Sequence, residues 1–331
     1  MNKRERVLNA IQRKAVDRTP VLCVNSTATE FQAEDLGLKW PDFHQSPAEM
    51  CRMAAGALDI LDFDAVRVPF CQTMEAEALG CAVSYKDFIP GNDVALYSLD
   101  ERPSFPGDFL KRGRIPALLE ALRSLKAHVG GRAVVMGGVT GPLTIARALL
   151  DSVPLLKASL KTPEKIIPFL EIGKRACLEL STALLRSGAD LIVMEDMSAS
   201  PDLLHPKTYK SIVNRYQKQV IEATEGPVVL HVCGNVALIA EELGKTEAIA
   251  LSIDRKADVR SMREKVPDTL PLIGGMETMA LALSTPSEIR TMCVGALKEG
   301  IEILAPGCAI PANAPTENLR AMVQAAEEFK G

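Results

Sequence analysis

Eight short apolar runs, separated by segments with helical patterning, constrain the fold of this chain most strongly. The runs are centred near residues 22, 66, 135, 192, 229, 250, 273 and 303. Strands that alternate with helices pair in parallel through right-handed crossovers. Eight such units in 331 residues predict an α/β fold of the (β/α)8 TIM-barrel type. We expect a single domain over residues 1–331 with an N-terminal helical extension.

A doubly wound parallel sheet is the alternative architecture. It is disfavoured because no apolar run is followed by the phosphate-binding fingerprint G-x-G-x-x-G. Residues 81–110 are rich in Pro, Gly and Asp and show no clear period. We expect them to form a long excursion, with a hairpin, that helps to cover a site.

Composition and charge exclude several classes of protein. The net charge is -4 and no basic patch is interleaved with aromatic residues, so nucleic acid is not an expected partner. No apolar run is long enough to span a membrane. The N-terminus begins with an amphipathic helical pattern rather than a signal sequence, which predicts a cytoplasmic protein. The eight cysteines are scattered, so we expect reduced thiols or metal ligands rather than disulfides.

Polar residues gather where the later apolar runs end. Active sites of barrels form at the C-terminal ends of the strands. His231 and Cys233 are two residues apart at the end of one run, and Cys308 follows the last run. One imidazole and two thiols are the donors of a three-ligand zinc site, whose fourth position stays open as in catalytic zinc centres. The alternative is that both cysteines are small buried hydrophobic residues.

Other candidates follow the same strand ends. Glu195 and Asp196 are predicted catalytic residues, as proton acceptors or a resting fourth ligand; the alternative is solvated rim charges. Asp254 and Gly275 are assigned to cofactor binding. Asp254 would orient His231 through its other ring nitrogen, or be a loop carboxylate. Gly275 would let a ligand approach closely, or merely end a strand.

Further acids, cysteines and histidines receive less specific predictions. Glu75 or Glu77 would reach the metal, or both would complement a helix dipole. The other six cysteines are expected to be packing residues: Cys23, Cys51, Cys71, Cys81, Cys177 and Cys293. The remaining histidines, His44, His128 and His205, are expected at the surface or in helix caps.

Several motifs resemble the uroporphyrinogen decarboxylase superfamily over nearly the whole chain. They are Lys3-Arg4-Glu5-Arg6-Val7-Leu8-Asn9-Ala10 with Asp17-Arg18-Thr19-Pro20, Pro69-Phe70-Cys71-Gln72-Thr73-Met74-Glu75-Ala76-Glu77-Ala78-Leu79-Gly80, and Gly141-Pro142-Leu143-Thr144. His231-Val232-Cys233-Gly234 and Pro306-Gly307-Cys308 with Pro315-Thr316-Glu317-Asn318 resemble its branch of cobamide-dependent methyltransferases that methylate coenzyme M. The resemblance implies Zn²⁺ held by His231, Cys233 and Cys308.

The resemblance also implies a reaction and its partners. A methyl group would pass from a methylated corrinoid, carried by a partner protein, to a small thiol acceptor, coenzyme M. The chain itself shows no Asp-x-His-x-x-Gly corrinoid signature. Tetrahydrofolate as acceptor, a decarboxylase-like enzyme and a corrinoid-protein binder without chemistry remain alternatives.

Two departures from the family patterns bear on these alternatives. Decarboxylases have an arginine-rich stretch after the first strand, where this chain reads Cys23-Val24-Asn25-Ser26-Thr27, which argues against decarboxylation. The loop Glu195-Asp196-Met197-Ser198-Ala199-Ser200 has Met where the methyltransferases usually have Pro, which leaves the acceptor more open than the class of reaction.

Overall fold

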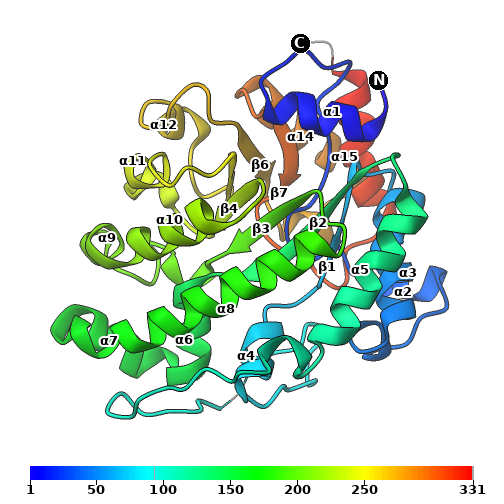
Figure 1. Cartoon of the computed structure of the whole chain (residues 1–331). Helices are drawn as coiled ribbons and strands as arrows, with labels where there is room; N and C mark the ends of the chain where they lie inside the picture. Colours follow the sequence, from blue (N-terminus) through cyan, green and yellow to red (C-terminus); the bar gives the residue numbers. More distant parts are fainter. Residues whose placement is uncertain (93, 330–331) are drawn as a thin grey trace.

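A curled parallel sheet surrounded by helices forms the molecule (Figure 1). The structure is a computed structural model that describes residues 1–92 and 94–329. Within these residues seven strands pair in sequence order, each with its neighbours in the chain. They are β1 (Ala65–Val68), β2 (Val134–Thr140), β3 (Leu191–Glu195), β4 (Val228–Val232), β5 (Ala250–Ile253), β6 (Leu272–Met276) and β7 (Ile303–Pro306). The predicted alternation is therefore confirmed as a barrel-like fold.

The eighth strand, predicted near residue 22, is not formed. The gap between β7 and β1 is instead bridged at Val21, which pairs in parallel with Leu304. The backbone N–H of Leu22 donates to the carbonyl of Leu304 at 3.1 Å, and the N–H of Asp64 donates to the carbonyl of Val21 at 2.7 Å. Pro20 offers no N–H, and the N–H of Val21 is taken by the Asp64 carboxylate at 2.7 Å. These two features limit the ladder on the N-terminal side of this bridge.

Helices cover the outside of the sheet and its two ends (Figure 1). The longer ones are α1 (Lys3–Ile11), α3 (Pro47–Asp59), α5 (Ile115–Val129), α6 (Pro142–Leu150), α7 (Ser152–Lys161), α8 (Ile167–Arg186), α10 (Asn214–Ala223), α14 (Pro286–Lys298) and α15 (Thr316–Glu328). The shorter ones are α2 (Glu30–Asp35), α4 (Met74–Leu79), α9 (Pro206–Thr208), α11 (Ala240–Leu243), α12 (Val259–Arg263) and α13 (Ala280–Leu283). No described helix is long and apolar enough to cross a membrane.

Local sequence signals explain where several helices begin. The Ser46 side chain caps α3 by accepting from the N–H of Glu49, and Pro47 occupies the first turn. Thr285 and Glu288 form a reciprocal capping box at the start of α14. Each device satisfies N–H groups that a helix start leaves without an intrahelical partner. The predicted helical start at Ser46 is confirmed.

Alternate residues of the strands form one central cluster, and their neighbours pack outward on the helices. The central cluster includes Val134, Met136, Leu191, Val193, Val229, Ala250, Ile273 and Ile303. Val7 and Ala10 of α1 belong to the same cluster, so this first helix packs against the strand interior; the N-terminal extension itself stays a prediction. Because side chains alternate along a strand, this register decides which residues face the inside of the barrel.

Candidate metal centre and cavity

His231, Cys233 and Cys308 meet at one end of the sheet. His231 lies on β4 in the inward register of Val229 and is completely buried. Its Nε2 is 3.1 Å from Sγ of Cys233, and that sulfur is 3.5 Å from Sγ of Cys308. The three potential ligand atoms lie within 4.8 Å of one another. The structure thus brings together the three residues that the sequence singled out.

The ring of His231 is oriented by Ser252, on the neighbouring strand β5. Its Nδ1 is 2.9 Å from Oγ of Ser252, and the two residues are paired in the parallel register. When Nδ1–H donates to this hydroxyl, Nε2 remains free as a lone-pair donor on the cysteine side. The prediction that Asp254 orients His231 is therefore wrong, since Ser252 occupies that position.

Asp254 instead holds the turn that carries Cys233. Its carboxylate accepts from the N–H of Gly234 at 3.1 Å and from the N–H of Lys256 at 3.1 Å. Gly234 has a φ of 81°, and a Cβ there would lie 2.3 Å from Oγ of Ser200. Only glycine fits this turn without strain. The cysteine is thus fixed by a tight turn and a carboxylate rather than by its own side-chain packing.

The two thiols share their charge. The hydrogen bond between them lowers the pKa of Cys308 to about 4 and raises the pKa of Cys233, which burial raises further. The pair therefore favours one thiolate, on Cys308, beside Nε2 of His231. Two thiol ligands and one imidazole with no carboxylate among them form a soft donor set suited to zinc. The chemistry of these donors fits the predicted zinc ion.

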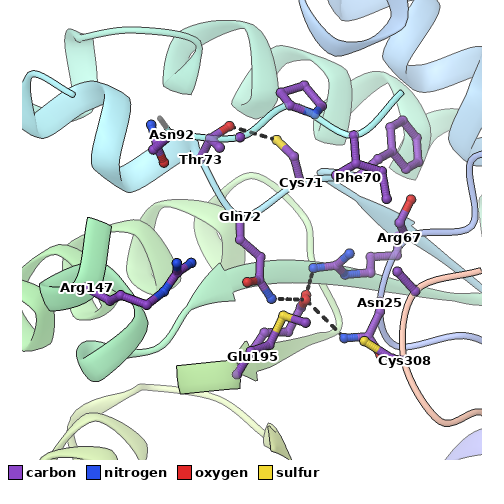
Figure 2. Close-up of a pocket in the computed structure, with 16 residues that line it drawn as sticks. Asn25, Arg67, Phe70, Cys71, Gln72, Thr73, Asn92, Arg147, Glu195 and Cys308 are labelled. Carbon is purple, nitrogen blue, oxygen red and sulfur yellow. Dashed lines mark hydrogen bonds and ion pairs between the residues drawn. The ribbon is translucent and has the colours of Figure 1, made fainter. Parts of the chain in front are cut away.

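A cavity of about 220 Å³ opens beside Cys308. The described residues that line it come from the segment at Asn25 and Ser26, from β1 and the segment after it, from the excursion at residues 81–110, from α6, and from the ends of β3 and β7 with the residues that follow them (Figure 2). Ser84 and Gly91 pair in an isolated antiparallel bridge, and Ile89, Pro90 and Gly91 form part of the cavity wall. Part of the excursion thus covers the cavity, as predicted for these described residues; that the cavity is a functional site stays a prediction.

Glu195 lies inside this cavity at the end of β3. Its carboxylate forms an ion pair with Arg67, and Oε2 accepts from Asn25 at 3.0 Å and from Gln72 at 2.7 Å (Figure 2). Arg67 is 2% exposed, and burial lowers its pKa to about 10, so the guanidinium stays charged at neutral pH. Glu195 therefore lies inside the barrel with two amide donors on Oε2 and the guanidinium of Arg67 beside Oε1.

The carboxylate of Asp196 points away from the cavity, toward the start of α6. Its carboxylate accepts from the N–H and the hydroxyl of Thr144, at 2.8 and 2.9 Å, and from Gln217 at 2.9 Å. It thus caps the first turn of α6, which begins at Pro142, and burial raises its pKa. Asp196 does not line the cavity. In this structure Asp196 holds the start of α6, and its catalytic role stays a prediction.

Gly275 and Glu75 also occupy structural positions. A Cβ on Gly275 would lie 2.7 Å from Cβ of Ala296 on α14, so this glycine permits close packing of a helix on β6. Glu75 is buried and accepts from the N–H of Thr140 at 2.6 Å and from its hydroxyl at 2.8 Å. The cofactor contact of Gly275 stays a prediction, and Glu75 is directed to β2 rather than to the candidate metal ligands.

Four residues of the site were missed by sequence reasoning: Asn25, Arg67, Gln72 and Ser252. Arg67 and Ser252 share the inward register of Ala65 and Ala250, so a strict alternation argument along β1 and β5 would have found both. Asn25 and Gln72 lie in irregular segments after strand ends, where no periodic signal exists.

The fold and site together define a barrel-like α/β protein with a cluster of one histidine and two cysteines, a candidate metal site, at the C-terminal end of its strands. The model of the family described as uroporphyrinogen decarboxylase (URO-D) matches residues 2–329, and the chain belongs to this family. Membership explains the barrel but leaves the reaction open, because folds host many activities.

Similar proteins narrow the comparison to methyltransferases. The chain is 32% identical to the methylcobamide:CoM methyltransferase MtaA of Methanosarcina barkeri (strain Fusaro / DSM 804), over 98% of this chain and 97% of the relative. It is 29% identical to MtbA of Methanosarcina acetivorans, over 99% and 98%. A solved methyltransferase structure from Methanosarcina mazei superimposes with a TM-score of 0.94 at 30% identity, covering 99% of both chains. The resemblance to the methyltransferase branch is confirmed.

Proposed function

We propose that the protein is a zinc-dependent methyltransferase that moves a methyl group from a methylated corrinoid, carried by a partner protein, to the thiol of coenzyme M. The convergence of His231, Cys233 and Cys308 beside a small cavity carries the proposal. The three residues act within one domain over residues 1–331. All eight cysteines are free, which supports a reducing compartment such as the cytoplasm.

The donor set favours a thiol as the group that is activated. Zinc bound here would supply Lewis acidity that keeps an added thiol deprotonated near neutral pH. Cys233 and Cys308 contribute negative charge, which keeps the sulfur of an added thiolate electron-rich. His231, held by Ser252 at 2.9 Å, supplies a neutral third donor in a fixed orientation. Three protein ligands leave one position for the acceptor.

The cavity fits a small anionic thiol better than a large ring system. Its volume of about 220 Å³ is below the range of about 300–1,000 Å³ typical of drug-sized ligands. Arg147 of α6 lies on the cavity wall, with its Nε donating to Oγ of Ser198 at 2.9 Å. Among the described residues no carboxylate forms an ion pair with it, so its charge is available for the sulfonate of coenzyme M.

Glu195 shapes the cavity by positioning the side chains of Arg67 and Gln72. Its Oε2 accepts from Asn25 and Gln72, and its carboxylate is ion-paired with Arg67. We assign it the task of holding Arg67 and Gln72 in place on the wall opposite the acceptor. In this arrangement Arg67 balances part of the negative charge that two thiolates and a bound thiol bring together.

The methyl donor is large and must approach from outside. Large apolar side chains are exposed on the segments that follow the C-terminal ends of β3, β4 and β6: Leu203, Leu238 and Met279. Such residues at the same end as the metal ligands suit the docking of a corrinoid-carrying partner protein. No methyl-donating compound upstream of the corrinoid would need to contact this chain.

The direct test is an assay of methyl transfer from methylcob(III)alamin to coenzyme M. The loss of the methylcobalamin absorbance measures the rate of transfer. The zinc-loaded protein should catalyse it, and His231→Ala, in which one ligand is removed, should not. A matched control is His205→Ala, because His205 caps the short helix α9 outside the site. Transfer to tetrahydrofolate but not to coenzyme M would overturn the assigned acceptor. No transfer to either would overturn the proposed function.

A further inference from the structure

Cys71 differs from the other buried cysteines outside the metal centre. It follows β1, is 5% exposed and lines the same cavity as Cys308 (Figure 2). Oγ1 of Thr73 donates to its sulfur at 3.2 Å, and Nη1 of Arg114 lies 3.7 Å away. Sequence reasoning treated Cys71 as a packing residue. Hydrogen-bond donors converging on its sulfur are instead the surroundings of a reactive thiolate.

Arg114 is held rigidly in this position. It is 7% exposed, its Nε forms an ion pair with Glu77 at 2.7 Å, and its Nη2 donates to Oγ1 of Thr73 at 2.6 Å. The guanidinium therefore cannot turn away from the sulfur without breaking both contacts. A fixed, buried cation beside a thiol favours the ionised form of that thiol.

His44 completes the cluster. It was expected at the surface or in a cap, but it is 1% exposed. Its Nε2 lies 3.2 Å from the carbonyl oxygen of Phe88 and must donate to it, while its Nδ1 has no hydrogen-bond partner among the described residues. Burial opposes ionisation of Cys71, but His44, Arg114 and Thr73 together lower its pKa to about 6. A buried imidazole with one unused nitrogen is the usual companion of a nucleophilic cysteine.

We propose that Cys71 is a modification site at which small disulfides, including the disulfide of the acceptor thiol, form a mixed disulfide that closes the cavity. The inference rests on the proposed function in one respect, since closing the cavity matters only if the acceptor binds there. Neither the zinc ligands nor the methyl donor takes part in the step.

The chemistry balances without a further reactant. The Cys71 thiolate attacks one sulfur of the disulfide, a new S–S bond forms to Cys71, and the original S–S bond breaks. The displaced thiolate leaves the cavity and takes a proton from solvent. The small disulfide is the oxidant and Cys71 is oxidised; an excess of free thiol attacks the mixed disulfide and restores the enzyme.

Cys81 provides a matched internal control. It is also 5% exposed, but burial raises its pKa to about 11 and it does not line the cavity. At neutral pH the larger thiolate fraction of Cys71 outweighs its lower intrinsic nucleophilicity by about tenfold or more. Cys71 should therefore react at least about tenfold faster than Cys81 with the same reagent.

The experiment treats the zinc-loaded protein with 2-hydroxyethyl disulfide and maps the adducts by peptide mass spectrometry. One adduct per chain at Cys71, removed by excess 2-mercaptoethanol, is expected. Cys71→Ser should carry no adduct and should retain its own starting rate of methyl transfer after treatment, whereas the wild type loses most of its rate. Adducts at Cys81 or at the metal ligands in place of Cys71 would overturn the inference, as would equal inactivation of Cys71→Ser.

The adduct map does not depend on methyl transfer, so the two proposals fail separately. A protein that is modified at Cys71 but transfers no methyl group would refute the proposed function and leave the modification site standing. Methyl transfer to coenzyme M without any adduct at Cys71 would support the proposed function and refute the modification site. Because the map is made on the wild type, a folding defect in Cys71→Ser would not prevent a decision.

Discussion

Replacing Ser252 by alanine tests how the metal centre is oriented. The change removes the partner of Nδ1 of His231, a contact of 2.9 Å around a completely buried ring. Losing one buried hydrogen bond costs about 1–3 kcal/mol. Loss of a hydrogen-bond partner behind a metal ligand lowers metal affinity by about tenfold to hundredfold. The two magnitudes agree, and we predict a fall in zinc affinity of that size for Ser252→Ala.

The assay is competition for zinc between the protein and a chromophoric chelator at fixed pH. Asp254→Asn is the matched comparison, because Asp254 contacts the N–H of Gly234 and not the imidazole. An asparagine there retains an acceptor oxygen, so zinc affinity should fall by less than in Ser252→Ala. The reasoning would be refuted by a large loss in Asp254→Asn together with an unchanged affinity in Ser252→Ala.

Three further changes give distinct readouts. Gly234→Ala places a Cβ 2.3 Å from Oγ of Ser200 at a φ of 81°. The substitution should lower the free energy of unfolding, measured by urea denaturation, by about 1–3 kcal/mol. An unchanged free energy of unfolding would contradict the strained turn. Arg147→Gln should raise KM for coenzyme M about tenfold with kcat nearly unchanged and no effect on KM for neutral 2-mercaptoethanol; equal effects on both thiols would argue against a sulfonate contact. Burial raises the pKa of Glu75 from 4.5 to about 7, so the folded protein binds this proton more tightly than the unfolded chain. The stability that this proton contributes is complete below pH 4.5 and is lost as the pH rises through about 7, by about 3 kcal/mol. Glu75→Gln should remove this part of the pH dependence of the free energy of unfolding. An unchanged pH profile in Glu75→Gln would contradict the prediction.

The barrel was predictable because its signal repeats along the chain. Apolar runs that alternate with helices define parallel pairing, and seven of the eight expected strands form in the expected order. The eighth run keeps only one bridge to β7, between Val21 and Leu304; before it, Pro20 lacks an N–H and the Asp64 carboxylate takes the N–H of Val21 at 2.7 Å. A carboxylate that far along the chain cannot be anticipated from the run itself.

The ligand cluster was predictable from strand ends, but the roles of neighbouring residues were not. Strand ends converge in a barrel, so His231, Cys233 and Cys308 could be placed together from sequence. Glu195 and Asp196 are adjacent and were treated alike, yet one faces the cavity and the other caps α6. Side-chain alternation at the end of β3 directs these two neighbours to opposite sides. The partners of Cys71 are harder to predict, because Arg114 and His44 come from segments distant in sequence.

The central claim is that two cysteine sulfurs and one imidazole hold zinc and that the acceptor thiol joins them. Zinc-edge X-ray absorption on the zinc-loaded protein, with and without coenzyme M, tests this most directly, because sulfur at about 2.3 Å and nitrogen at about 2.0 Å are resolved. The account predicts two sulfur neighbours without coenzyme M and three with it. An unchanged sulfur count upon addition of coenzyme M, under conditions in which methyl transfer proceeds, would contradict it.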